Sequence, residues 1–135
     1  MARYVIDSPT LLHVVDAGLA IDAGHQLVAP AAIRSEVMQL LLRDVRRGDR
    51  TDRAALAVHE QITGVKIRVL NDRVSRATAW RIAREQDWDT LRDAEYLAVT
   101  RLQADALVTI DPGLTARAGN LVALAPLPAL LAGDR

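Results

Sequence analysis

The sequence predicts an α/β fold with a mostly parallel central sheet of about five strands, flanked by helices. Short apolar runs alternate along the chain with longer segments of helical periodicity, which is the pattern of strand–helix–strand units. One run, residues 106–110, is apolar at nearly every position, as is typical of parallel strands that are buried on both faces. The length of 135 residues fits a single domain over residues 1–135.

The first half of the chain begins with a short strand that ends at Asp7, and Pro9 then favours the start of a helix. Further on, Ile33, Val37 and Leu40 recur at helical spacing. The elements expected in this half are a strand over 4–6, a helix from 9 to 16, a strand over 26–29, a helix from 31 to 47 that Gly48 ends, and a helix from 51 to 63 that Gly64 ends.

In the second half, Asp72 and Thr90 are residues that commonly cap a helix, so each marks a helix start. Pro126 and Pro128 mark the end of the regular structure. The expected elements are a strand over 67–70, a helix from 72 to 86, a helix from 91 to 102, a strand over 106–110, a short helix or turn over 112–118 and a last strand over 121–124.

The composition excludes several classes of protein. With no cysteine, the chain has no disulfides, no thiolate chemistry and no zinc site with Cys ligands. The 17 basic and 17 acidic residues balance, whereas a general nucleic-acid coat would be more basic. Asp7 interrupts the apolar stretch that a signal peptide would need, and no apolar run of about 18 residues exists, so we expect a cytoplasmic protein without a membrane span.

Four acids occupy positions where active sites form in such folds. Asp7 and Asp111 directly follow predicted strands, and Glu36 and Asp93 lie near the first turn of predicted helices. Each also has a structural explanation as a helix cap, a turn former or a charge that favours a helix N-terminus. Because the carboxyl ends of parallel strands meet at one edge of the sheet, we expect these four carboxylates to converge there.

Carboxylates that are held close together repel one another unless a cation neutralises them. Hard divalent cations such as Mg²⁺ and Mn²⁺ prefer carboxylate and water oxygens, and they can activate water and stabilise charge on a phosphate. His13, His25 and His59 are scattered, and we expect them in loops or on packing faces. The residues alone therefore favour a hard-metal site that acts on phosphodiesters.

Three segments share the pattern of one known family. They are 5–12, which contains the first strand and Asp7; 30–36, a strand end and a helix bearing Glu36; and 93–98 followed by 106–111, with an Asp-Ala-x-x-x-Ala helix and a Thr-x-Asp strand end. In these segments the sequence resembles PIN-domain proteins and, more narrowly, the VapC toxins of bacterial type II toxin–antitoxin pairs. The match runs from Tyr4 to about Pro126, essentially the whole chain.

The resemblance implies a single PIN-like domain that is a sequence-selective endoribonuclease dependent on Mg²⁺ or Mn²⁺. Asp7 and Asp93 would be the firmest metal ligands, Asp111 comes next, and Glu36 is the acid most easily explained by the helix dipole. Asp111 and Glu36 would complete the pocket by binding metal or orienting the attacking water, and the hydroxyl of Thr109 would assist. The family usually forms homodimers, and a cognate antitoxin inhibits it by covering the pocket.

The sequence departs from the family pattern at two places. Pro9 stands where the family often has Ser or Thr, and Ser8 and Thr10 are the neighbouring hydroxyls that could replace it. Residues 112–115 contain no further acid after Thr-x-Asp, so a second metal is not implied.

Two other classes of protein are compatible with parts of the pattern. A phosphoacceptor receiver domain also has acids at strand ends, but it needs a Lys after its last strand, and Lys66 is the sole Lys in the chain. A catalytically inactive PIN-like module that only binds protein or RNA stays open because of Pro9, although all four expected acids are present.

Residues 43–53 mix Arg with Asp, which is compatible with RNA or antitoxin contact and also with a solvated helix end with local Arg–Asp pairs. Trp80 and Trp88 are expected to be core or interface anchors rather than platforms on which bases stack.

Overall fold

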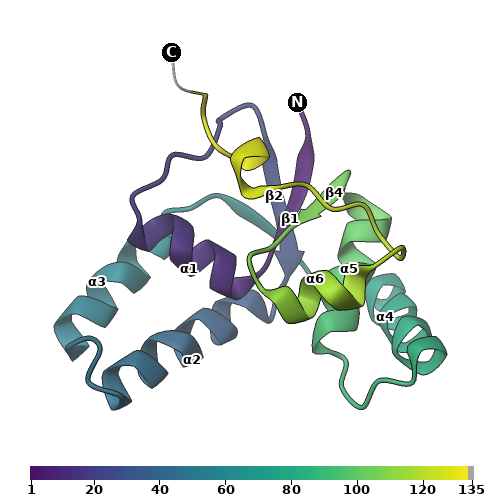
Figure 1. The fold of residues 1–135 in the computed structure, drawn as a ribbon, viewed down its shortest axis with the longest axis horizontal. Coiled ribbons are helices and arrows are strands. Elements are labelled where there is room, and N and C mark those ends of the chain that lie inside the picture. Colours follow the sequence, from purple (N-terminus) through teal and green to yellow (C-terminus); the bar gives the residue numbers. More distant parts are fainter. Residues whose placement is uncertain (134–135) are drawn as a thin grey trace.

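The computed structural model describes residues 1–133, which form four parallel strands with helices on both faces of the sheet (Figure 1). The predicted α/β class is confirmed, and the strand order is β3-β2-β1-β4. The elements in chain order are β1 (Arg3–Ile6), α1 (Ser8–Asp16), β2 (Gln26–Pro30), α2 (Ile33–Arg46), α3 (Asp52–Thr63), β3 (Ile67–Leu70), α4 (Arg73–Gln86), α5 (Arg92–Gln103), β4 (Ala106–Val108), α6 (Pro112–Ala118) and the 3-10 helix η1 (Leu127–Leu130).

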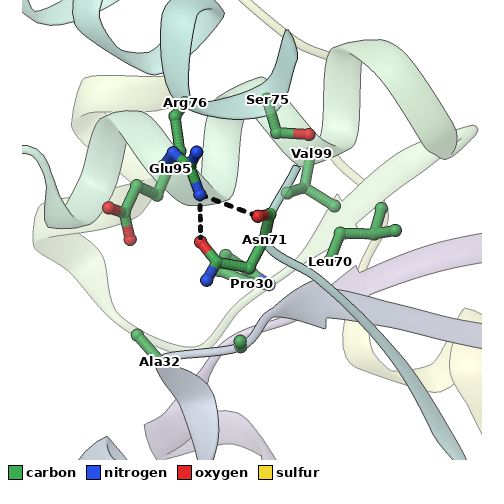
Figure 2. A pocket seen from close by; sticks show the side chains of 9 residues that line it. Pro30, Ala32, Leu70, Asn71, Ser75, Arg76, Glu95 and Val99 are labelled. Carbon is green, nitrogen blue, oxygen red and sulfur yellow. Dashed lines mark hydrogen bonds between the residues drawn. The ribbon is translucent and has the colours of Figure 1, made fainter. Parts of the chain in front are cut away.

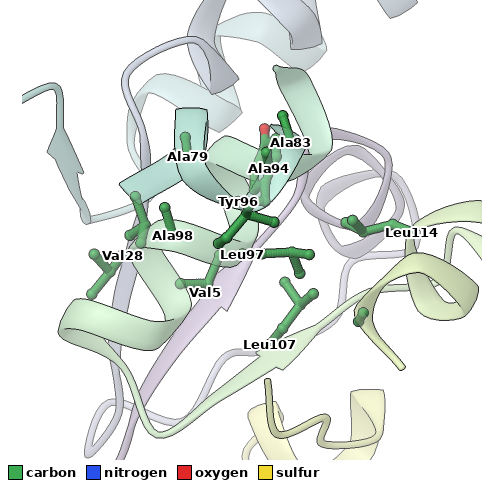
Figure 3. Packing of buried hydrophobic residues seen from close by; sticks show 13 residues of the cluster. Val5, Val28, Ala79, Ala83, Ala94, Tyr96, Leu97, Ala98, Leu107 and Leu114 are labelled. Carbon is green, nitrogen blue, oxygen red and sulfur yellow. The ribbon is translucent and has the colours of Figure 1, made fainter. Parts of the chain in front are cut away.

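The sheet is buried on both faces because successive side chains of a strand point to opposite sides. Val5 of β1 packs with Leu97 and Leu107 on the face covered by α4, α5 and α6 (Figure 3). The next residue, Ile6, packs on the other face with Leu11 and the helices α1, α2 and α3 (Figure 1). Among residues 1–133, no helix has both the length and the apolar character needed to cross a membrane.

Helix α5 is buried along most of its length and packs against β1, β2 and β4. Ala94, Leu97 and Ala98 are fully buried, and the small alanine side chains let this helix lie close to the sheet in a protein without Phe. The close packing fixes the first turn of α5 at the edge where the parallel strands end.

The predicted strand over 121–124 is wrong, so the sheet has four strands rather than about five. Only Leu124 forms a bridge, a parallel one with Leu107. The amide of Leu121 instead donates to the carbonyl of Ala118 at 2.7 Å, in the turn after α6. Because β4 is only three residues long, it offers this segment little backbone to pair with.

Strand β4 is shorter than the predicted 106–110 and ends at Val108. The amide of Ile110 donates to the hydroxyl of Thr10 at 2.9 Å, and the amide of Asp111 donates to the hydroxyl of Thr109 at 3.0 Å. Side-chain hydroxyls therefore replace sheet partners here, and the hydroxyl of Thr10 joins the segment after β4 to the first turn of α1.

The two tryptophans differ in their surroundings. Trp88 is partly buried and packs against the core cluster that contains Leu97, as predicted. Trp80 on α4 is 61% exposed, so it is not a core residue, and its role as an interface anchor stays a prediction.

Arg50, within the Arg-rich segment 43–53, joins α1 to the turn between α2 and α3. Its guanidinium pairs with Asp44 at 2.9 Å and with Asp16 at 2.5 Å. Local Arg–Asp pairing is therefore confirmed for Arg50, whereas the other arginines of the segment are exposed, and their contact with RNA or an antitoxin stays a prediction.

Asp16→Asn is expected to lower stability at neutral pH but not in acid. The hydrogen bond from Arg50 holds the pKa of Asp16 below its ordinary value of 3.8, although burial acts in the opposite direction. A depressed carboxyl pKa stabilises the fold above the ordinary value, and this contribution is lost as the pH falls through the depressed pKa. Since Asp16 is 37% exposed, we expect the substitution to lower the free energy of unfolding near pH 7 by less than about 1 kcal/mol. Urea unfolding near pH 7 and near pH 3 checks this, and an equal difference at both pH values would contradict it.

Candidate active site

Asp7 is fully buried where β1 ends. Its carboxylate accepts hydrogen bonds from the hydroxyl of Thr10 and, at 2.8 Å, from the hydroxyl of Thr109. Although Asp7 is the N-cap residue of α1, the hydrogen bond that its side chain accepts from the first turn comes from the Thr10 hydroxyl and not from a capping backbone amide. A role as a helix cap therefore does not account for the second hydrogen bond, which comes from Thr109.

Burial raises the pKa of Asp7. The hydrogen bonds from Thr10 and Thr109 and the positive charge of Arg92 act in the opposite direction and do not cancel the effect. An ionised carboxylate in such a place is unfavourable for folding unless it is compensated. A buried acid whose pKa is shifted by burial is typical of functional sites.

Glu36 lies in the first turn of α2, where its charge favours the helix N-terminus. This role does not account for the contacts of its side chain. It accepts hydrogen bonds from the hydroxyl of Tyr96 at 2.7 Å and from the hydroxyl of Ser8 at 3.1 Å. Burial, with the hydrogen bond to Glu36 and its charge, raises the pKa of Tyr96, so this phenol stays protonated and donates. The Glu36 carboxylate is therefore held by side chains of α1 and α5, beside Asp7.

Arg92 links Glu36 to Asp93. Its guanidinium lies 3.3 Å from Glu36 (Nε to Oε2), 2.7 Å from Asp93 (Nη1 to Oδ1) and 3.3 Å from the Ser8 hydroxyl. Burial alone would lower the pKa of Arg92, but the charges of Glu36 and Asp93 raise it above its ordinary value. We call Asp7, Glu36 and Asp93 the acid cluster; Arg92 lies between Glu36 and Asp93, and its positive charge acts on Asp7.

The second carboxylate oxygen of Asp93 accepts a hydrogen bond from Arg117 of α6 at 3.1 Å. The Arg117 guanidinium also lies 4.7 Å from the centre of the Trp88 ring. Both oxygens of Asp93 are thus paired with arginines, and this half-buried acid serves neither as a cap nor as a free surface charge.

Asp111 is close to the acid cluster but is used differently. Its carboxylate accepts a hydrogen bond from the amide of Gly113 at 3.1 Å, which caps α6. Its link to Asp7 is indirect, because the hydroxyl of Thr109 accepts from the Asp111 amide and donates to Asp7. The structure therefore brings Asp7, Glu36 and Asp93 together, and it places Asp111 beside them as a helix cap.

The chemistry of the acid cluster fits a hard divalent cation, since it offers carboxylate and hydroxyl oxygens. As the side chains stand, no three acids or histidines within residues 1–133 are close enough to hold a metal ion. Arg92 gives a physical reason, because its guanidinium lies between Glu36 and Asp93 and supplies the positive charge there. A metal ion and this guanidinium would neutralise the same carboxylates.

Sequence reasoning did not identify Arg92 or Tyr96 as part of the site. For Arg92 a signal existed: a cation in the first turn of a helix is unfavourable to the helix dipole, so it needs an acidic partner nearby. For Tyr96 there was no such signal, because a buried aromatic residue on a helix is usually a core residue.

A parallel sheet with carboxylates gathered at the carboxyl ends of its strands defines an α/β protein with a candidate acidic active site. No protein-family model matches the chain, and no curated protein matches it. The fold is similar to that in the crystal structure of PAE2754 from Pyrobaculum aerophilum, with a TM-score of 0.69 and 21% sequence identity over 96% of this chain and 93% of that one. At this identity the likeness shows the fold alone.

Proposed function

We propose that this chain is a metal-dependent endoribonuclease, the VapC-like toxin of a type II toxin–antitoxin pair, with a PIN-like domain. The observation that carries the proposal is Asp7, a fully buried carboxylate that the hydroxyls of Thr10 and Thr109 hold at the same edge of the sheet as Glu36 and Asp93. The resemblance of three sequence segments to the VapC toxins supports the same activity.

In this proposal Asp7 and Asp93 hold Mg²⁺ or Mn²⁺, and Glu36 and Asp111 complete the site. The metal would activate a water molecule and stabilise negative charge on the phosphodiester. Thr109, with its neighbour Thr10, fixes the Asp7 carboxylate by hydrogen bonds.

Glu36 is held in one orientation by the hydroxyls of Tyr96 and Ser8, which suits it to accept a proton from the attacking water. Arg92 and Arg117 offset the negative charge of the acids and present guanidinium groups to the RNA backbone. Such phosphate contacts give affinity and position but no choice of sequence.

The proposal also includes the partners expected of this class, which are an RNA substrate, a cognate antitoxin and a second copy of the chain. It further includes a cytoplasmic location. Large apolar side chains are exposed on the helices, including Met38 and Leu42 on α2, Leu56 on α3 and Trp80 on α4. Exposed apolar and aromatic side chains are typical of surfaces that bind another protein.

The purified protein is expected to cut RNA in Mg²⁺ or Mn²⁺ and to be inactive in EDTA. Asp93→Asn should slow cleavage on the order of 100-fold, because it removes a ligand charge from a metal site that contributes several kcal/mol. Asp52→Asn is the matched control, since Asp52 is an exposed acid in the first turn of α3. Cleavage in EDTA, or full activity of Asp93→Asn, would contradict the proposal.

The two alternative functions are distinguished by the same structure and assay. A receiver domain needs a Lys near its acids, but Lys66 precedes β3 and so lies at the opposite edge of the sheet from Asp7. If the chain is instead an inactive binding module, the folded protein is expected to cut no RNA in either Mg²⁺ or Mn²⁺.

A further inference from the structure

A pocket of about 190 Å³ opens where β2 and β3 end (Figure 2). It is smaller than the roughly 300–1,000 Å³ of pockets for drug-sized ligands, so it suits one flat ring system. Its wall is apolar and its rim is polar. The wall includes Pro30, Leu70 and Val99, and the rim includes Asn71, Arg76 and Glu95.

Glu95 contributes a carboxylate that has no hydrogen-bond donor among residues 1–133. It is partly buried in the first turn of α5, at the rim of the pocket. No side-chain oxygen among residues 1–133 is both buried and unpaired, so solvent reaches this carboxylate, and a ligand that brings N–H groups can take the place of the water.

Arg76 contributes a guanidinium on the same rim (Figure 2). Asn71 holds it in place, because one terminal nitrogen of Arg76 donates to the Asn71 carbonyl at 2.9 Å and to its side-chain oxygen at 3.3 Å. Within residues 1–133, Arg76 and Glu95 form no ion pair with each other. The rim therefore presents the Arg76 guanidinium as a hydrogen-bond donor and the Glu95 carboxylate as a separate acceptor.

From this arrangement we propose that the pocket binds a nucleobase of the RNA and prefers guanine, an inference that rests on the proposed nuclease function. Glu95 accepts hydrogen bonds from N1–H and the N2 amino group of the base, and Arg76 donates to O6 and N7. Guanine is the RNA base that offers two neighbouring donors and two neighbouring acceptors at once. Leu70, on the apolar wall, packs against the ring.

The position of the pocket fits a single strand of RNA laid along the carboxyl edge of the sheet. In the strand order, Asp111 follows β4 and Asp7 follows β1, while the pocket lies where β2 and β3 end. A strand whose phosphate reaches the acid cluster therefore places a neighbouring base over the pocket. The expected consequence is cleavage next to a guanine.

The test is an NMR titration of the ¹⁵N-labelled wild-type protein in EDTA with guanosine monophosphate, adenosine monophosphate and inorganic phosphate. We expect the guanine nucleotide to bind about tenfold more tightly than the adenine nucleotide, with shifts at the amides of Leu70, Asn71 and Ser75. Phosphate alone should not move these amides. Glu95→Gln should weaken the guanine preference, because only the contacts of Arg76 with O6 and N7 then remain, whereas Glu60→Gln, at an exposed glutamate on α3, should leave it unchanged.

Equal binding of the two nucleotides, or an unchanged preference in Glu95→Gln, would overturn the proposal. The titration needs neither metal nor cleavage, so its result is separate from that of the nuclease assay. Guanine-selective binding without RNA cleavage would overturn the proposed nuclease function and support the pocket. Cleavage by a protein that shows no guanine preference would overturn the pocket alone.

Discussion

Asp7→Asn is expected to lower the rate of metal-dependent RNA cleavage on the order of 100-fold or more. The variant keeps the shape of the side chain but loses the charge that would bind a divalent cation at the end of β1. Single-turnover cleavage in Mg²⁺ and in Mn²⁺ measures the effect. Asp105→Asn is the matched control, because Asp105 precedes β4 at the opposite edge of the sheet and accepts a hydrogen bond from the Arg3 amide at 2.8 Å.

The same substitution is expected to leave the metal-free protein at least as stable as the wild type near neutral pH. Burial raises the pKa of Asp7 above its ordinary value of 3.8, so the ionised form is disfavoured in the folded protein. The stability of the wild type relative to Asp7→Asn is therefore greatest below pH 3.8 and falls as the pH rises through the raised pKa.

Urea unfolding in EDTA, near pH 3 and near pH 7, measures this difference. If Asp7→Asn is less stable than the wild type by more than about 2 kcal/mol near pH 7, Asp7 is a structural residue. In that case the stabilisation from its hydrogen bonds exceeds the cost of burying its charge. Lost cleavage with retained stability is the combination expected of a functional acid.

The position of Asp7 could be predicted from the sequence, but its burial could not. A short apolar run followed by an acid and Pro9 is a local pattern, and it indicates a strand end before a helix. The burial of Asp7 depends on Thr109, which is 102 residues further along the chain and donates to its carboxylate. The α/β class was predictable for the same reason as the strand end, because it depends on local periodicity.

The roles of Glu36 and Asp111 show where local patterns stop being informative. Both stand at positions where a dipole or cap explanation is available, and the sequence favoured Asp111 over Glu36 as part of the site. In the structure Tyr96 and Arg92, both distant in sequence, hold Glu36 in the acid cluster. Asp111 instead caps α6 through Gly113. Only the tertiary contacts distinguish the two acids.

Arg92→Gln is expected to tighten the binding of Mn²⁺ about tenfold, a change of roughly 1.4 kcal/mol. The wild-type guanidinium contacts Glu36 and Asp93 at 3.3 Å and 2.7 Å, so a metal ion must displace it to reach these carboxylates. Isothermal titration with Mn²⁺ measures the affinity. Arg101→Gln is the matched control on the same helix, because Arg101 is exposed and its one side-chain hydrogen bond among residues 1–133 goes to the carbonyl of Leu121, at 3.4 Å.

In EDTA, Arg92→Gln should lower the free energy of unfolding by about 1–2 kcal/mol, since the carboxylates then repel one another without a counter-ion. The expected loss lies below that of a fully buried ion pair because the Arg92 side chain is 36% exposed. Mn²⁺ should restore stability more in the variant than in the wild type. The same loss in Arg101→Gln would show that the effect does not come from the acid cluster.

The two measurements on Arg92→Gln separate two roles that the contacts of Arg92 allow. If the arginine competes with the metal, removing it tightens Mn²⁺ binding and destabilises the metal-free protein at the same time. If it instead positions Glu36 and Asp93 as ligands, removing it weakens Mn²⁺ binding. The competing role is the one we expect, because the guanidinium lies between the carboxylates and contacts both. Once a metal displaces it, the same guanidinium is available to an RNA phosphate, so Arg92→Gln should bind metal more tightly yet cleave RNA more slowly.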